Sequence, residues 1–145
     1  MAIGVSWLVT FFPSFLLAIL VSLLLPGAKQ PQFPFSGMDL FVRIVVVAPV
    51  LETLIMGAAL LVLQLIFRPT LSVVMTAILA GLAHSFSPTG VAVWGLVIWW
   101  PFLIFATLFV VWRQRSLLAA FAVPAVTHAL HNLPTAALIV SGIKV

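Results

Sequence analysis

The sequence predicts an all-α fold: a polytopic transmembrane helical bundle of about five spans, forming one membrane domain over residues 1–145. The first observation is composition, since 65% of the residues are apolar, 6% are charged and the mean hydropathy is +1.39. A soluble domain carries roughly 25% charged residues, so this chain cannot cover a surface that faces water. The second observation is a series of apolar runs close to the roughly 20 residues that a membrane-spanning helix needs. These runs cover about 5–25, 39–67, 71–86, 91–112 and 117–140.

The first two runs end at residues that stop helices. The run 5–25 stops at Pro26-Gly27. It lacks a basic n-region and a small-residue cleavage site, so we interpret it as a retained span and not as a signal peptide. The run 39–67 is long enough to tilt and ends at Arg68-Pro69. Pro49 is expected to kink it, because proline has no backbone N–H to donate.

The remaining three runs are short or interrupted. The run 71–86 ends at Ser-Pro-Thr-Gly, residues 87–90, which predicts a tight turn. The run 91–112 contains one proline after a Trp-Trp pair, and the polar residues 113–115 close it. The run 117–140 contains two prolines. All three are predicted to be membrane helices, with local distortion at the prolines.

The charges exclude some classes of function. Six basic and two acidic residues give a net charge of +4, and no basic cluster interleaved with aromatic residues is present, so no nucleic-acid partner is expected. The chain has no cysteine, which excludes disulfides and thiol chemistry. The chain is expected to be a multi-pass protein of a cell (plasma) membrane. A cytoplasmic N-terminus is slightly favoured by the positive-inside rule, with Arg68, Arg113 and Arg115 on that side and Lys29, Lys144 and Arg43 opposite.

One acidic residue, Glu52, lies well inside the second expected span. On insertion scales an ionisable side chain at the centre of a membrane helix costs roughly 2.5–3.5 kcal/mol, so it needs a partner or a function. Pro49, three residues earlier, leaves a backbone carbonyl unpaired and so suggests a local site for water. The structural alternative is a protonated glutamic acid that is hydrogen-bonded to a neighbouring helix.

Two other expected spans also carry polar side chains. His84 lies near the end of the third, one turn after two small residues that allow another helix to approach. His128 and Asn132 are four residues apart and share one face of the fifth, with His131 partly on the same side. Interhelical hydrogen bonds, or a metal clip made by His128 and His131, would also explain this group.

Together these residues predict a hydrolytic site in the membrane. Polar groups from three spans reach their lowest energy when they share one interior pocket, where they satisfy one another and hold water. A carboxylate beside imidazoles can activate water, with Glu52 taking the proton and a histidine positioning it. Histidine and asparagine side chains can also donate hydrogen bonds to the oxyanion of a tetrahedral intermediate.

The same residues resemble the motifs of the CPBP intramembrane proteases, which include the type II CAAX prenyl proteases. The family pattern is Glu-Glu-x-x-x-Arg, often after Ala-Pro, then Phe-x-x-x-His, then His-x-x-x-Asn or Asp, each on a separate span. Glu52, after Ala48-Pro49, falls on the first glutamate, and His84 falls on the histidine of the second motif. His128 and Asn132 match the third motif, and the order and spacing of the motifs agree.

The resemblance implies an intramembrane endopeptidase that cleaves a membrane-associated protein or peptide. It implies that Glu52 and His84 activate water and that His128 and Asn132 stabilise the oxyanion. It implies no cofactor, although two histidines and a glutamate could bind zinc, which is left open. Membrane lipid is the other expected partner, and the oligomeric state is not predicted.

Three departures from the family pattern keep other functions open. Thr53 replaces the second glutamate, Gly57 the arginine and Ala80 the phenylalanine. One alternative is therefore a catalytically weakened relative that acts as a binding or immunity-type membrane protein. The other is a small proton-coupled transporter in which Glu52 alone carries the proton.

Overall fold

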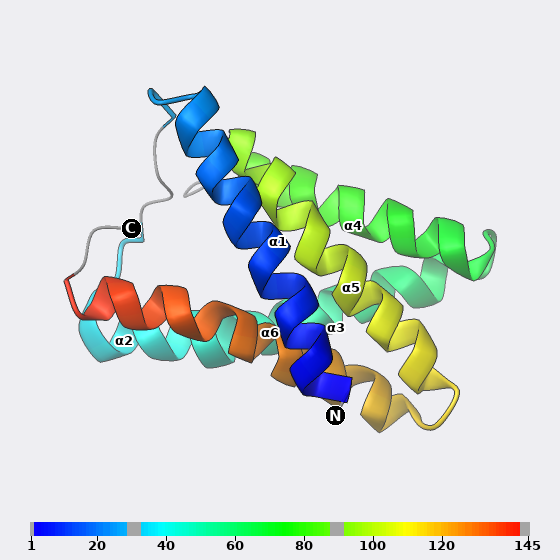
Figure 1. Ribbon diagram of the computed structural model, residues 1–145. Helices are drawn as coiled ribbons and strands as arrows, with labels where there is room; N and C mark the ends of the chain where they lie inside the picture. Colours follow the sequence, from blue (N-terminus) through cyan, green and yellow to red (C-terminus); the bar gives the residue numbers. More distant parts are fainter. Residues whose placement is uncertain (1, 29–32, 88–91, 143–145) are drawn as a thin grey trace.

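The computed structural model describes residues 2–28, 33–87 and 92–142. These residues form a bundle of α-helices (Figure 1). Lys29, Lys144 and residues 88–90 of the expected turn lie outside the described residues. The helical elements are α1 (Ala2–Leu24), α2 (Gly37–Val42), the π-helical turn η1 (Arg43–Val47), α3 (Ala48–Leu63), α4 (Pro69–Ser85), the 3₁₀ turn η2 (Ala92–Trp94), α5 (Gly95–Arg113) and α6 (Leu117–Val140).

The predicted all-α membrane bundle is confirmed. Among the described residues, four helical stretches are long and apolar enough to cross a membrane: Ala2–Leu24, Gly37–Leu63, Ala92–Arg113 and Leu117–Val140. The third expected span is α4, an apolar helix of 17 residues. The second span ends at Leu63 and not at 67, because residues 64–67 form the turn that leads into Pro69 at the start of α4.

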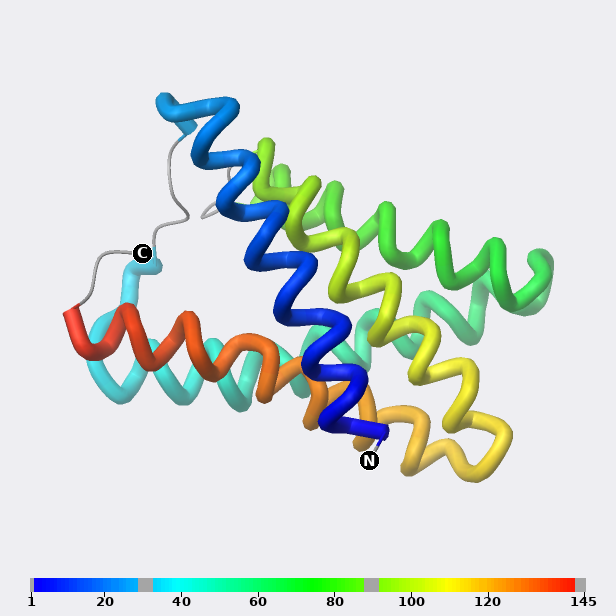
Figure 2. The backbone as a smooth tube through the Cα atoms, in the orientation of Figure 1, coloured from blue at the N-terminus to red at the C-terminus, as the bar shows by residue number. Residues whose placement is uncertain are grey.

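The helices cross one another at several angles (Figure 2). α3 runs beside α6, α4 packs against α5, and α5 packs against α6. α1 lies across α5 and α6 on the outside of the bundle. The core where α3, α4, α5 and α6 meet contains Leu60, Phe105 and Phe109, each at most 1% exposed. Large apolar side chains on the outer faces of the helices are exposed, as a bundle surrounded by lipid requires.

The expected distortion around Pro49 takes the form of a π-helical turn. The Ala48 N–H donates to the carbonyl of Arg43, five residues back, at the end of η1. Pro49 has no N–H, so it cannot donate to the next carbonyl in this register, that of Ile44. The distortion therefore leaves the Ile44 carbonyl without a donor from its own helix.

Two tryptophans attach α1 to the bundle at carbonyls that prolines leave free. Trp100 Nε1 donates to the carbonyl of Val9 at 2.9 Å, and Pro13 is the residue four further on that cannot donate to it. Trp7 Nε1 donates to the carbonyl of Leu130 at 2.9 Å, four residues before Pro134. In lipid an unpaired carbonyl costs several kcal/mol. The indole N–H groups therefore stabilise both the interrupted helices and the docking of α1.

α4 and α5 approach closely at two glycines. A Cβ added to Gly81 would lie 2.9 Å from the Gly95 carbonyl oxygen, and one added to Gly95 would lie 2.6 Å from the Gly81 carbonyl oxygen. Ser85 Oγ lies 3.0 Å from the Gly81 carbonyl oxygen and 2.8 Å from that of Ala92, so it joins the end of α4 to the start of α5. Small residues at this crossing allow the backbones to touch, as is typical of membrane helices.

We predict that Gly95→Ala destabilises the protein. Its methyl group would collide with Ser85 Oγ and the Gly81 backbone and force α4 away from α5, at a cost of about 1–3 kcal/mol. Gly4→Ala on α1 is the matched control, because nothing lies within 4 Å of its added Cβ. Unfolding in detergent should show a lower midpoint for Gly95→Ala only. Equal midpoints for the two variants would contradict this packing.

Candidate functional site

The structure brings Glu52, His84 and His128 together from three helices. Glu52 Oε2 lies 3.7 Å from His84 Nε2 and 3.8 Å from His128 Nε2. Glu52 is on the second turn of α3, His84 on the last turn of α4 and His128 midway along α6. Of the expected gathering of an acid, two imidazoles and the Asn132 amide, the acid and both imidazoles are therefore together. Both separations exceed the range of a direct hydrogen bond and are short enough for one small molecule to touch all three atoms.

The protonated nitrogen of His84 follows from its helix. His84 Nδ1 lies 2.9 Å from the carbonyl oxygen of Ala80, one turn earlier. A carbonyl can only accept, so Nδ1 carries the proton in the neutral ring and Nε2 presents a lone pair toward Glu52. The backbone of α4 thus makes Nε2 of His84 an acceptor.

The environment of His128 favours the opposite tautomer. Its side chain is 6% exposed, and its Nδ1 is buried without a hydrogen-bond partner among the described residues. A proton on Nδ1 would have no acceptor, whereas a proton on Nε2 faces the Glu52 carboxylate. His128 is therefore assigned as a donor at Nε2, and the two imidazoles offer Glu52 one acceptor and one donor.

Two phenylalanines of α5 hold the rings in place. The Phe102 ring centroid lies 5.5 Å from that of His84 and 5.5 Å from that of His128, and Phe105 stacks on His128 at 4.6 Å. Both phenylalanines are at most 4% exposed. Sequence reasoning missed them, because within a long apolar helix they look like any other core residues.

The cluster is open on one side. The side chains of Glu52 and His84 are 31% and 32% exposed, while that of His128 is 6% exposed. His128 with its phenylalanines is therefore the buried end of the cluster, and Glu52 and His84 form its partly exposed rim. The other acid of the chain, Asp39, is paired with Arg43 at 2.9 Å and takes no part in this cluster.

Asn132 lies one turn beyond His128, but its amide is committed elsewhere. Asn132 Nδ2 donates at 3.0 Å to the carbonyl of Ile44, the acceptor that η1 and Pro49 leave without a donor. The local site for water suggested by Pro49 is thus filled by a side chain from α6. That Asn132 stabilises an oxyanion, as the family resemblance implies, stays a prediction.

His131 points away from the cluster toward α1 and α5. Its ring meets those of Phe11 and Phe105 edge-on, at centroid distances of 6.2 and 6.1 Å. Its Nδ1 is buried without a hydrogen-bond partner in the part of the chain that the structure describes. His131 therefore packs as an aromatic ring behind the site.

The structure explains one departure from the family pattern, the glycine at position 57 where the pattern has an arginine. A Cβ added to Gly57 would lie 2.7 Å from Phe109 Cε2 and would also collide with the ring of Phe121. These two rings pack edge to face at 5.0 Å and fill the space that a longer side chain would need. An arginine at position 57 is therefore incompatible with this packing of α3 against α5 and α6.

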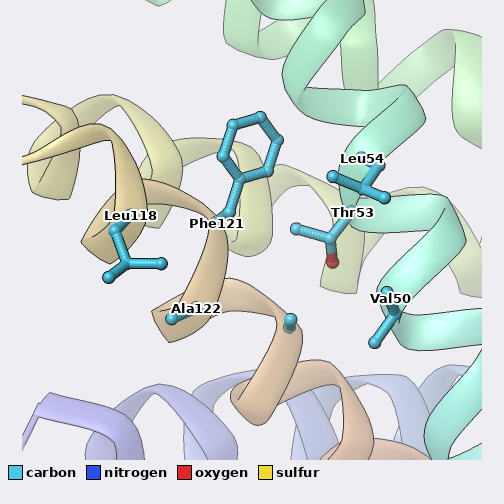
Figure 3. A pocket seen from close by; sticks show the side chains of 7 residues that line it. Val50, Thr53, Leu54, Leu118, Phe121 and Ala122 are labelled. Atoms are coloured by element: carbon cyan, nitrogen blue, oxygen red, sulfur yellow. The ribbon is translucent and has the colours of Figure 1, made fainter.

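Thr53, at the position of the second family glutamate, faces a different region from Glu52. It is 2% exposed and lines a groove of about 180 Å³ between α3 and α6, whose other lining residues are all apolar (Figure 3). Glu52 and the two imidazoles do not line this groove. A carboxylate at position 53 would be buried among apolar side chains without a partner, at a greater cost than the Thr53 hydroxyl, which is itself buried without a hydrogen-bond partner among the described residues.

Fold and cluster together define a class: a helical membrane protein with an acid–imidazole cluster inside the bundle. Comparison of the chain with protein-family models, curated proteins and solved structures finds no match. The resemblance to the CPBP proteases stays an expectation from the motif residues. No group of three or more His, Cys, Asp or Glu residues with the geometry to hold a metal ion is found within residues 2–28, 33–87 and 92–142. The expectation of no cofactor, with zinc left open, stays a prediction.

We predict that Phe102→Leu makes the imidazole rings of His84 and His128 less rigidly held. Loss of the ring between them should lower the stability of the bundle by about 1–2 kcal/mol and move the ¹⁵N resonances of His84 and His128. Phe15→Leu is the control, since Phe15 is 52% exposed on α1 and its loss should cost less than about 0.5 kcal/mol. Unchanged imidazole resonances in Phe102→Leu would show that the ring does not position the histidines.

Proposed function

We propose that the protein is an intramembrane endopeptidase of the CPBP, CAAX-protease-like kind, a multi-pass protein of a cell (plasma) membrane. The observation that carries the proposal is the position of Glu52 Oε2, 3.7 Å from His84 Nε2 and 3.8 Å from His128 Nε2. Three polar groups on three helices, arranged around one point, can together bind a water molecule and take a proton from it.

In the proposed mechanism Glu52 is the general base. A water molecule at the centre of the cluster gives one proton to the Glu52 carboxylate, while its other O–H stays intact and donates a hydrogen bond to His84 Nε2. The water oxygen forms a bond to the carbonyl carbon of the substrate, and the carbonyl oxygen becomes an oxyanion that accepts from His128 Nε2–H. Glu52 then passes its proton to the leaving nitrogen, and the C–N bond breaks to give a carboxylic acid and an amine.

The position of the rim favours a substrate that arrives from the lipid. Glu52 and His84 are each about a third exposed, and the neighbours of Glu52 on α3 include the exposed Leu51 and Ile55. The expected substrate is therefore an apolar segment of a membrane-associated protein or peptide whose backbone is locally unwound.

We predict that Glu52→Gln, His84→Asn and His128→Asn each lower peptide cleavage by about 10²–10⁴-fold, the usual contribution of a general base or its partner. The measurement is cleavage of a library of apolar peptides by the protein reconstituted in liposomes, with and without a chelator. His131→Phe and Asp39→Asn are the matched controls, because neither residue contacts Glu52. His131→Phe keeps the ring contacts and removes a buried unpaired nitrogen.

The same variants separate the alternatives. A weakened relative that acts by binding keeps its ligand after Glu52→Gln and cleaves nothing. A proton-coupled transporter loses uptake in Glu52→Gln and retains it in His84→Asn. Cleavage that is equal in the wild type and Glu52→Gln would overturn the proposed function.

A further inference from the structure

The amide of Asn132 makes a long-range bond that has a clear structural cause. Its Nδ2 donates at 3.0 Å to the Ile44 carbonyl, across the contact between η1 and α6. Within its own helix that carbonyl has no donor, because the Ala48 N–H is turned to Arg43 and Pro49 has none. The bond therefore pairs a side chain on the α6 turn after His128 with the backbone eight residues before Glu52.

The geometry points to Asn132 as a positioning residue that sets the separation between Glu52 and His128 by holding the π-turn of η1 against α6. Only the kinetic test of this inference, described below, rests on the proposed function. It differs from a direct role at the oxyanion, in which the amide would touch the substrate. A bond of this kind is effective in lipid, because the alternative is an unpaired carbonyl and an unpaired amide in an apolar medium.

The location of the bond explains why it would act on the site. Asn132 is four residues after His128 on one face of α6, and Ile44 is eight residues before Glu52 on the continuous helix of η1 and α3. Rotation or sliding of this helix relative to α6 would move Glu52 Oε2 away from its 3.8 Å separation from His128 Nε2. A displacement of about 1 Å at reacting groups can cost about 10²-fold in rate.

Pro49→Ala supplies the decisive test, because it returns an N–H that can donate to the Ile44 carbonyl from within the helix. We predict that Asn132→Ala lowers kcat by about 10–100-fold with little change in KM, because the groups are displaced while substrate binding persists. In the Pro49→Ala background the same substitution should lower kcat by less than about threefold, because the carbonyl is already paired. Asn132→Leu, which fills the space without a donor, should behave like Asn132→Ala.

An oxyanion role gives the opposite result. A donor to the oxyanion is worth about 10²–10³-fold in kcat whatever residue stands at position 49. Equal losses from Asn132→Ala in the wild-type and Pro49→Ala backgrounds would therefore overturn the positioning role.

A spectroscopic test of the positioning role does not require the protein to cleave a peptide. The chain has three histidines, so the ¹⁵N resonance of His128 can be assigned by single substitutions of the other two. Asn132→Ala should shift the His128 Nε2 resonance, and Pro49→Ala/Asn132→Ala should return it toward its position in Pro49→Ala. If the wild type cleaves no peptide but this pattern is found, the proposed function fails and the positioning role stands. An unshifted resonance in Asn132→Ala overturns the positioning role.

Discussion

The structure depends on one constraint: polar groups inside an apolar bundle must find one another. Lipid offers no hydrogen bonds, so each buried donor or acceptor that is left alone raises the free energy of the fold by several kcal/mol. The cluster of Glu52, His84 and His128 follows from this constraint, since an acceptor nitrogen from α4 and a donor nitrogen from α6 lie 3.7 and 3.8 Å from one carboxylate oxygen, close enough for one small molecule to join the three. The same arrangement gives the cluster its chemical capability.

Prolines extend the constraint to the backbone. Pro13, Pro49 and Pro134 each deprive a carbonyl of its helical donor, and in each case a side chain from another helix donates to it: Trp100 to Val9, Asn132 to Ile44 and Trp7 to Leu130. Three interruptions of helices are thereby converted into three attachment points between helices. The prolines are thus part of how the bundle is assembled, and one of the attachments lies beside the cluster.

The sequence was sufficient to predict what depends on composition and spacing. The apolar runs predicted the helices, and the cost of burying Glu52, His84 and His128 in lipid predicted that they would meet. The end of the second span was predicted four residues too far along, because residues 65–67 are apolar although they belong to a turn. Hydropathy reports the medium around a segment and not its backbone conformation.

What the sequence could not predict are contacts that depend on how helices cross. Phe102 and Phe105 have the same apolar signature as any core residue, and only the crossing of α5 places them against the imidazoles. In the same way Asn132 carries no sign that its partner is the Ile44 carbonyl: Pro49 predicts that a carbonyl is left free, but the π-helical turn decides that it is the one of Ile44. The loss of the family arginine at Gly57 also became understandable only when Phe109 and Phe121 were seen to fill that space.

The central claim is that the Glu52 carboxylate lies between two imidazoles within the membrane, and its most direct test is a solid-state NMR distance measurement in lipid bilayers. Glu52 is the sole glutamate of the chain, so glutamate labelled with ¹³C at Cδ marks one site, and ¹⁵N-histidine marks three. The account predicts strong dipolar dephasing of the Glu52 carbon by ring nitrogens, reduced in His84→Asn and in His128→Asn and unchanged in His131→Phe. A carboxyl carbon that shows no dephasing by any ring nitrogen would contradict it.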